Sequence, residues 1–139
     1  MTTPPRSASD ECCGMRYFPR MLDKMRLHEK GELRPDFHEN LGKAMDARCC
    51  GFLGVDYNTI RRLVCEGKTD DEIYKWCSQN GRNLSEVDLL VWNSFVSKLG
   101  WNDFASDRLK QLKAESGLSD RDDILTMGDY FEVDEGRRT

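Results

Sequence analysis

Four charged side chains in two neighbouring segments are the residues of this 139-residue chain best suited to chemistry: Arg20, Asp23, Lys24 and Arg48. The planar guanidinium of an arginine binds a carboxylate or a phosphate at two points, and a lysine ammonium adds positive potential beside it. An aspartate nearby can hold one cation in place through an ion pair. The set therefore indicates a binding site for an anion, with Arg48 as its anchor and Asp23 as an orienting group.

Arg48 is the most informative of the four because of the segment around it. The apolar residues of one predicted helix face are Leu41, Ala44, Met45, Cys49 and Phe52. Arg48 lies in the middle of this face, and a buried guanidinium without a partner costs several kcal/mol. Two interpretations are open: a structural ion pair, for which Asp23 is a candidate partner, and an anion-binding pocket between the first two helices. The ion pair is favoured because buried charges are usually paired.

The other three candidates share one side of a predicted helix over residues 18–30. Its apolar side consists of Phe18, Met21, Leu22 and Met25. Arg20, Asp23 and Lys24 fall on the opposite side, together with Leu27. The ordinary interpretation is a solvated charged face. The alternative is a rim where Arg20 and Lys24 meet an anionic ligand or a protein partner.

Two histidines provide the alternative in which the protein is a small enzyme. His28 and His38 are separated by a loop, and an imidazole can act as a general acid or base near neutral pH. The chain has no nucleophile-elbow, phosphate-loop or dinucleotide-binding motif. We therefore favour a non-enzyme, and leave a histidine acid or base at the anion site as the runner-up.

Cysteine is abundant but shows no metal-ligand spacing. The six cysteines are Cys12, Cys13, Cys49, Cys50, Cys65 and Cys77. Structural zinc sites usually contain Cys-x-x-Cys or His-x-x-x-His, and neither pattern occurs here. We therefore expect reduced thiols, no metal site and no cofactor.

The elements that must position these side chains are predicted to be helices. Glycines follow the amphipathic stretches. Three of these stretches begin with a capping pattern: Thr69–Glu72, Ser85–Asp88 and Ser119–Asp122. No segment alternates strictly enough to indicate a strand. The predicted ranges are 18–30, 40–53, 56–66, 70–80, 86–99, 103–116 and 120–132. We expect an all-α fold, a compact single-domain bundle of about seven short helices with no sheet.

The predicted domain covers residues 15–133. Residues 1–14 are rich in Thr, Pro and Ser, and they are expected to form a flexible N-terminal tail, as residues 134–139 are at the C-terminus. The helix over 86–99 is apolar around much of its circumference, which predicts that other helices surround it.

Composition narrows the classes of partner. The net charge is −4 and no basic stripe follows a helix, so we expect no nucleic-acid binding. No apolar run approaches the roughly 20 residues of a membrane span, so no membrane association is expected. The N-terminus lacks a secretory signal, which favours the cytoplasm. The sequence carries no signal for an oligomeric state.

Several short segments resemble a known family. They are Pro19 to Arg26, Gly31, Phe52 to Asp56, and Gly67 to Glu72. Together these segments resemble the bacterial domain-of-unknown-function family 5069, over nearly the whole chain after the tail. The resemblance implies a small bacterial cytoplasmic protein and brings no established activity, ligand or catalytic residue.

These observations lead to one expected function and two alternatives. We expect a small cytoplasmic binding or regulatory module with an anion pocket near the first two helices. The alternatives are the histidine enzyme and a structural protein-interaction module, which an exposed apolar patch would indicate.

Overall fold

The computed structural model covers residues 1–139, and helices form most of it. The α-helices are α1 (Phe18–Glu29), α2 (Met45–Leu53), α3 (Tyr57–Cys65), α4 (Asp70–Asn80), α5 (Glu86–Lys98), α6 (Ser106–Glu115) and α7 (Met127–Asp134). A 3-10 helix, η1 (Pro35–Asn40), lies between α1 and α2. The strands β1 (Glu11–Cys12) and β2 (Met15–Arg16) form a small antiparallel sheet before α1. The predicted helical class is confirmed, whereas the prediction of no sheet is wrong and the eighth, 3-10 helix was not predicted.

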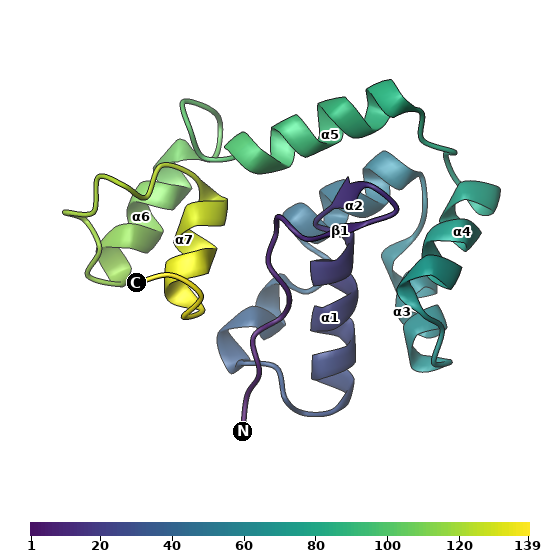
Figure 1. The fold of residues 1–139 in the computed structure, drawn as a ribbon. Helices are drawn as coiled ribbons and strands as arrows, with labels where there is room; N and C mark the ends of the chain where they lie inside the picture. Colours follow the sequence, from purple (N-terminus) through teal and green to yellow (C-terminus); the bar gives the residue numbers. More distant parts are fainter.

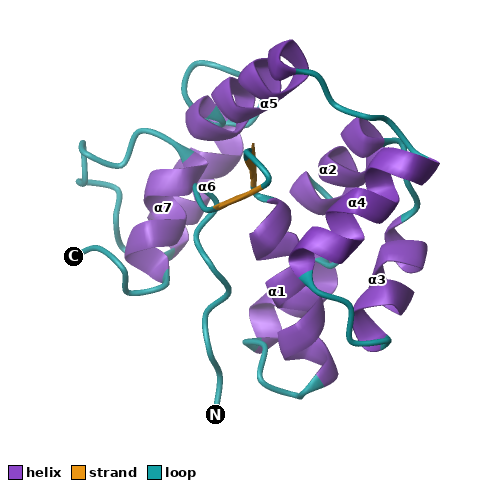
Figure 2. Cartoon of the chain, turned by 45° about the vertical axis from the view of Figure 1, so that its right-hand side comes forward, coloured by secondary structure: helices purple, strands orange, loops and turns teal.

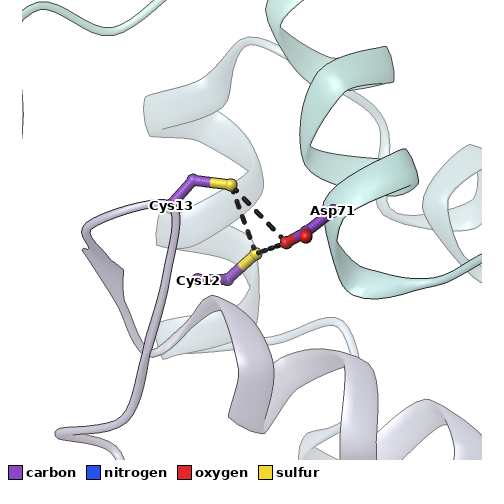
Figure 3. A group of neighbouring side chains, drawn as sticks. All are labelled: Cys12, Cys13 and Asp71. Carbon is purple, nitrogen blue, oxygen red and sulfur yellow. Dashed lines mark hydrogen bonds between the residues drawn. The ribbon is translucent and has the colours of Figure 1, made fainter.

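The sheet was missed because its strands have only two residues each. Cys13 and Gly14 connect them with φ angles of 53° and 83°, the left-handed conformation of a tight hairpin turn. Side chains of α5 hold the hairpin: the Asn93 amide donates to the Gly14 carbonyl at 2.8 Å, and the Trp92 indole donates to the Arg16 carbonyl at 2.8 Å. The turn also brings Cys12 and Cys13 next to Asp71 of α4 (Figure 3). The hairpin therefore depends on long-range contacts that no local pattern reports.

The helices divide into two groups that α5 connects (Figure 1). The hairpin and α1 to α4 enclose the main apolar core with the inner side of α5, while α6 and α7 close over a small cluster of Leu109, Ile124 and Tyr130. The extended N-terminal segment runs past α1, between it and the α6–α7 pair (Figure 2). None of the helices is both long and apolar enough to cross a membrane.

The most enclosed helix is α1, not α5. Seven residues of α1 are buried, and Arg20 and Lys24 are among them, so the interpretation of their side as a solvated face is wrong for these two cations. In α5 only Trp92 and Val96 are buried, whereas Val87 and Leu90 are about two-thirds exposed, at 66% and 67%. An all-round apolar pattern thus did not identify the central helix, because part of the apolar surface of α5 remains uncovered.

Two helix starts, those of α2 and α7, lie five residues or more from the predicted ones. Helix α2 begins at Met45 and not near residue 40, because Gly42 and Ala44 adopt positive φ angles of 74° and 51° that interrupt a right-handed helix. Helix α7 begins at Met127 and not near residue 120, because the capping box is formed by Thr126 with Asp129. The predicted caps at Thr69 and Ser85 are confirmed.

Both terminal segments contribute buried side chains. In residues 1–14, predicted as a flexible tail, Ala8 and Cys12 belong to the main core. In the same segment, the Arg6 guanidinium forms an ion pair with the Asp23 carboxylate of α1 at 2.9 Å. In residues 134–139, also predicted as a tail, the Glu135 carboxylate is only 1% exposed. The two ends of the chain therefore take part in the packing around α1.

Candidate functional site

A cavity of about 660 Å³ lies between the group of helices that contains α1 and α2 and the α6–α7 pair. Helix α1, η1 and the start of α2 form one wall, and α6, α7 and the loop before α6 form the other. Three of the four predicted site residues line it: Arg20, Lys24 and Arg48. Leu99, Phe104, Leu112 and Met127 are among its apolar lining residues. A volume of this size accommodates a small organic molecule.

Arg48 lines the cavity but is exposed, which corrects the prediction that it lies on a buried helix face. The buried residues of α2 are Met45, Asp46, Cys49, Cys50 and Leu53. At about 100° per residue, Arg48 lies well outside this arc. No ion pair involves its guanidinium, and the predicted pair with Asp23 does not form. Arg48 instead lies over the Phe104 ring, 4.8 Å from the centroid.

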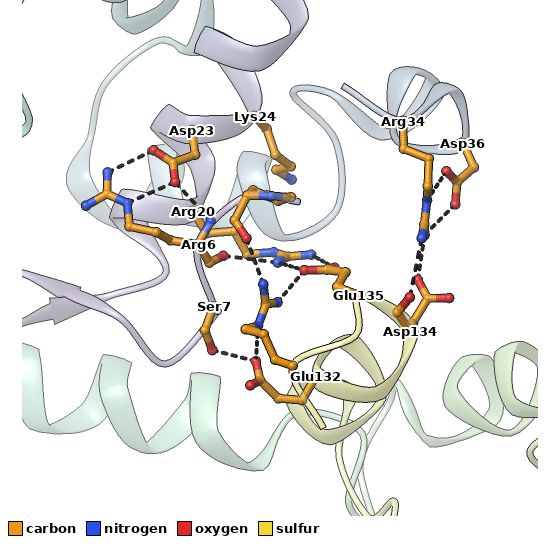
Figure 4. Close-up of polar contacts among 12 residues, drawn as sticks. Arg6, Ser7, Arg20, Asp23, Lys24, Arg34, Asp36, Glu132, Asp134 and Glu135 are labelled. Carbon is orange, nitrogen blue, oxygen red and sulfur yellow. Dashed lines mark hydrogen bonds and ion pairs between the residues drawn. The ribbon is translucent and has the colours of Figure 1, made fainter. Parts of the chain in front are cut away.

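Arg20 is held by a buried ion pair with the C-terminal segment. Its side chain is 2% exposed, and its two terminal nitrogens donate to the Glu135 carboxylate at 2.8 and 2.6 Å (Figure 4). The guanidinium also lies 4.5 Å from the centroid of the Phe131 ring. Burial alone would lower the pKa of Arg20, but the hydrogen bonds and charge of Glu135 outweigh burial and raise it. Arg20 thus has a protein partner and contributes little free charge to the cavity.

Lys24 belongs to a second buried cluster, which joins α1 to α2. Its ammonium lies 2.7 Å from the Asp46 carboxylate and donates to the Tyr17 hydroxyl at 2.9 Å. The Tyr17 hydroxyl in turn donates to Asp46 at 2.6 Å, and the Gly42 amide donates to the same carboxylate. Burial lowers the pKa of Lys24, although the charge and hydrogen bond of Asp46 act in the opposite direction. The buried charge of α2 is therefore Asp46, not Arg48.

Sequence reasoning missed Asp46 because the helix face was assigned with the wrong rotation. Asp46, Cys50 and Leu53 have the spacing i, i+4, i+7, which is the sequence signal of a helix face that includes Asp46. Asp23, in contrast, does not line the cavity. Its carboxylate accepts from Arg6 at 2.9 Å and lies 3.5 Å from Arg26. Asp23 therefore orients neither Arg20 nor Lys24.

Three cations that line the cavity have no ion-pair partner in the structure: Lys43, Arg48 and Arg108. Two lining carboxylates, Glu39 and Glu115, are likewise free of ion pairs, whereas the lining pair of Asp36 and Asp134 binds Arg34. The three unpaired cations and two unpaired carboxylates leave an excess of one positive charge, next to the apolar residues that line the cavity. This arrangement suits an organic anion better than a cation.

The histidines lie together elsewhere. The rings of His28 and His38 meet edge to face with centroids 4.8 Å apart, and neither residue lines the cavity. His28 Nδ1 contacts the Arg61 guanidinium, and His38 Nε2 lies 3.0 Å from the Leu33 carbonyl oxygen. Burial, Arg61 and His38 together lower the pKa of His28. The geometry therefore gives no support to a histidine acid or base at this cavity.

No curated protein matches the chain. A protein-family model with the description "Domain of unknown function (DUF5069)" matches residues 2–137. Since the match covers nearly every residue, the chain belongs to the DUF5069 family.

Proposed function

We propose that the protein is a small bacterial cytoplasmic binding module that holds an organic anion in the cavity between α1, α2 and the α6–α7 pair. The observation that carries the proposal is Arg48, an exposed guanidinium that has no carboxylate partner and stacks on Phe104 at the cavity wall. An arginine in this setting keeps all its hydrogen-bond donors for a ligand.

The chemistry of the lining indicates the class of ligand. A carboxylate or phosphate group would bind near Arg48, Lys43 and Arg108, while an apolar or aromatic part would pack against Phe104 and Met127. Arg20 and Lys24 line the same space but are neutralised by Glu135 and Asp46. They therefore contribute to the walls of the cavity but not the additional positive potential that was predicted for them from the sequence.

Phenyl phosphate and inorganic phosphate together test the proposal. Phenyl phosphate should raise the melting temperature of the wild type more than inorganic phosphate does. Only phenyl phosphate has an aromatic ring that can pack against the apolar residues of the cavity. Arg48→Ala should weaken phenyl phosphate binding by about tenfold or more, since a hydrogen bond to a charged group contributes about 1.5–3 kcal/mol. Calorimetric titration measures the affinity.

Arg62→Ala is the matched control, because Arg62 is an exposed arginine of α3 that forms no ion pair and does not line the cavity. This variant should bind as the wild type does. If neither phosphate stabilises the wild type, or if Arg48→Ala and Arg62→Ala respond alike, the cavity is not an anion site.

A second function, self-association through α5, is favoured by a specific surface. Val87, Leu90 and Val91 are more than half exposed on one side of this helix. An apolar recess of about 350 Å³, which Phe52 and Phe95 help to line, continues from Val91. We propose a second copy of this chain as the partner, because antiparallel pairing of two α5 helices would bring the acidic N-terminal turn of each toward Lys98 of the other.

Sedimentation velocity tests this interface. The wild type should dimerise, and Leu90→Glu should raise the dissociation constant at least about 100-fold, because both copies lose a buried leucine worth about 1.5–3 kcal/mol. The control Leu125→Glu changes another leucine that is more than half exposed, outside α5, and should leave the dimer intact. A wild type that stays monomeric at every concentration would rule out this partner.

A further inference from the structure

Two thiols and a carboxylate converge outside the cavity, at the contact between the hairpin and α4 (Figure 3). Cys12 ends β1 and Cys13 follows it in the turn, while Asp71 is the second residue of α4. Figure 3 shows both sulfur atoms directed toward the Asp71 carboxylate. The three residues come from segments almost 60 positions apart, so no sequence spacing could indicate the group.

The distances within the group match those of metal ligands. The two sulfur atoms are 3.8 Å apart, and they lie 3.5 and 3.7 Å from the nearer oxygen of Asp71. A tetrahedral Zn²⁺ has bonds of about 2.3 Å to sulfur and about 2.0 Å to oxygen, which separate two sulfurs by roughly 3.8 Å and a sulfur from an oxygen by roughly 3.5 Å. The three atoms thus have the size and shape of one face of a coordination tetrahedron.

The charges around the group leave the Asp71 carboxylate available. Its neighbour Asp70 pairs with Arg6 and Arg26 at 2.7 Å, whereas no cation of the protein pairs with Asp71. Cys12 is only 5% exposed, while Cys13 and Asp71 are exposed. The group therefore has a desolvated sulfur at its base and an open outer side through which an ion can enter.

Contacts outside the group hold the two backbone segments that carry the three side chains. Asn93 holds the hairpin turn from both sides, since it accepts from the Arg16 amide at 2.9 Å and donates to the Gly14 carbonyl at 2.8 Å. The capping box of Thr69 and Glu72 fixes the first turn of α4, from which Asp71 projects. Because both segments are held in place, the backbone that carries the ligands loses little conformational entropy when an ion binds.

We propose that Cys12, Cys13 and Asp71 bind one divalent metal ion of borderline softness, of the Zn²⁺ or Co²⁺ class. Two sulfurs with one oxygen suit such ions, whereas Mg²⁺ and Ca²⁺ prefer oxygen ligands alone. Each thiol exchanges its proton for a bond to the metal, two protons pass to solvent, and no electron is transferred. Three protein ligands leave the fourth position for water or a small exogenous ligand, as in zinc sites that are open to substrate.

Titration of the reduced full-length protein with Co²⁺ tests the proposal, because thiolate bonds to Co²⁺ give charge-transfer absorption in the near ultraviolet. The wild type should bind one Co²⁺ per chain with this absorption, and Zn²⁺ should displace the ion and abolish the signal. Cys13→Ser and Asp71→Asn should each weaken Co²⁺ binding at least about tenfold, since even supporting residues of metal sites contribute that much. Cys13→Ser should also reduce the thiolate absorption, because it removes one of the two thiolates.

Cys65→Ser provides the control, because Cys65 is another exposed cysteine beside a carboxylate, at 3.3 Å from Glu29, without a second thiol. This variant should bind Co²⁺ as the wild type does. Both Cys13 and Asp71 are exposed, so their variants should keep the wild-type circular dichroism. Absence of thiolate absorption in the wild type, or wild-type affinity in Cys13→Ser or Asp71→Asn, would overturn the proposal.

Discussion

Glu135→Ala should lower the free energy of unfolding by about 3–5 kcal/mol, although Glu135 lies beyond the last helix. The Arg20 side chain is 2% exposed in the wild type, so the substitution leaves a buried guanidinium without its carboxylate. Arg137, which also contacts Glu135, loses the same partner. Urea denaturation of the two proteins measures the difference.

Two further variants show whether the loss comes from a stranded buried charge. Asp36→Ala breaks an exposed pair with Arg34 and should cost less than about 1 kcal/mol. Adding Arg20→Met to Glu135→Ala should restore part of the lost stability, because an apolar side chain of similar length needs no partner. Equal losses for Glu135→Ala and Asp36→Ala would mean that the buried pair does not hold the C-terminal segment.

Asp46→Ala should produce a loss of similar size, about 3–5 kcal/mol. The carboxylate is 0% exposed, and it is the partner of both the Lys24 ammonium and the Tyr17 hydroxyl. Its removal leaves the buried Lys24 ammonium without a carboxylate and the buried Tyr17 hydroxyl without an acceptor, at the junction of α1 and α2. Denaturant unfolding followed by circular dichroism measures the effect.

The matched comparison lies two residues further along the same helix. Arg48→Ala should cost less than about 1 kcal/mol, because its guanidinium is exposed and loses only the contact with Phe104. A double-mutant cycle between Asp46→Ala and Lys24→Met should show strong coupling, since either change alone strands the other charge. A larger loss for Arg48→Ala than for Asp46→Ala would reverse the assignment of the buried charge on α2.

Local features of the fold could be predicted from the sequence because they depend on neighbours along the chain. The caps at Thr69 and Ser85 satisfy backbone donors within one turn, and the range of α1 follows from the spacing of Phe18, Met21 and Met25. Such contacts span four residues or fewer, so the pattern that causes them is visible in the sequence. Arg20 and Lys24 were predicted on one side of this helix, and both line the cavity. Their shared side could be predicted because the range of the helix was predicted correctly.

The rotation of α2 and the exposure of α5 could not be decided locally. An apolar arc that contains Arg48 and one that contains Asp46 are both compatible with the residues of α2, and only the approach of Lys24 and Tyr17 selects the second. Val87 and Leu90 in α5 are as apolar as core residues, but no element of the chain covers them. Periodicity identifies a face, whereas its neighbours determine whether that face is buried.

The sequence by itself determined the helical class, most helix ends and the charged set from which the anion site was inferred. Only the tertiary structure decided which charges are already paired, because Arg20 and Glu135 meet across 115 residues and Cys12 and Asp71 across 59. Distances in space between such residues are fixed by the packing of several helices at once. The free cations of the cavity and the cysteine group at the hairpin therefore became visible only in the folded chain.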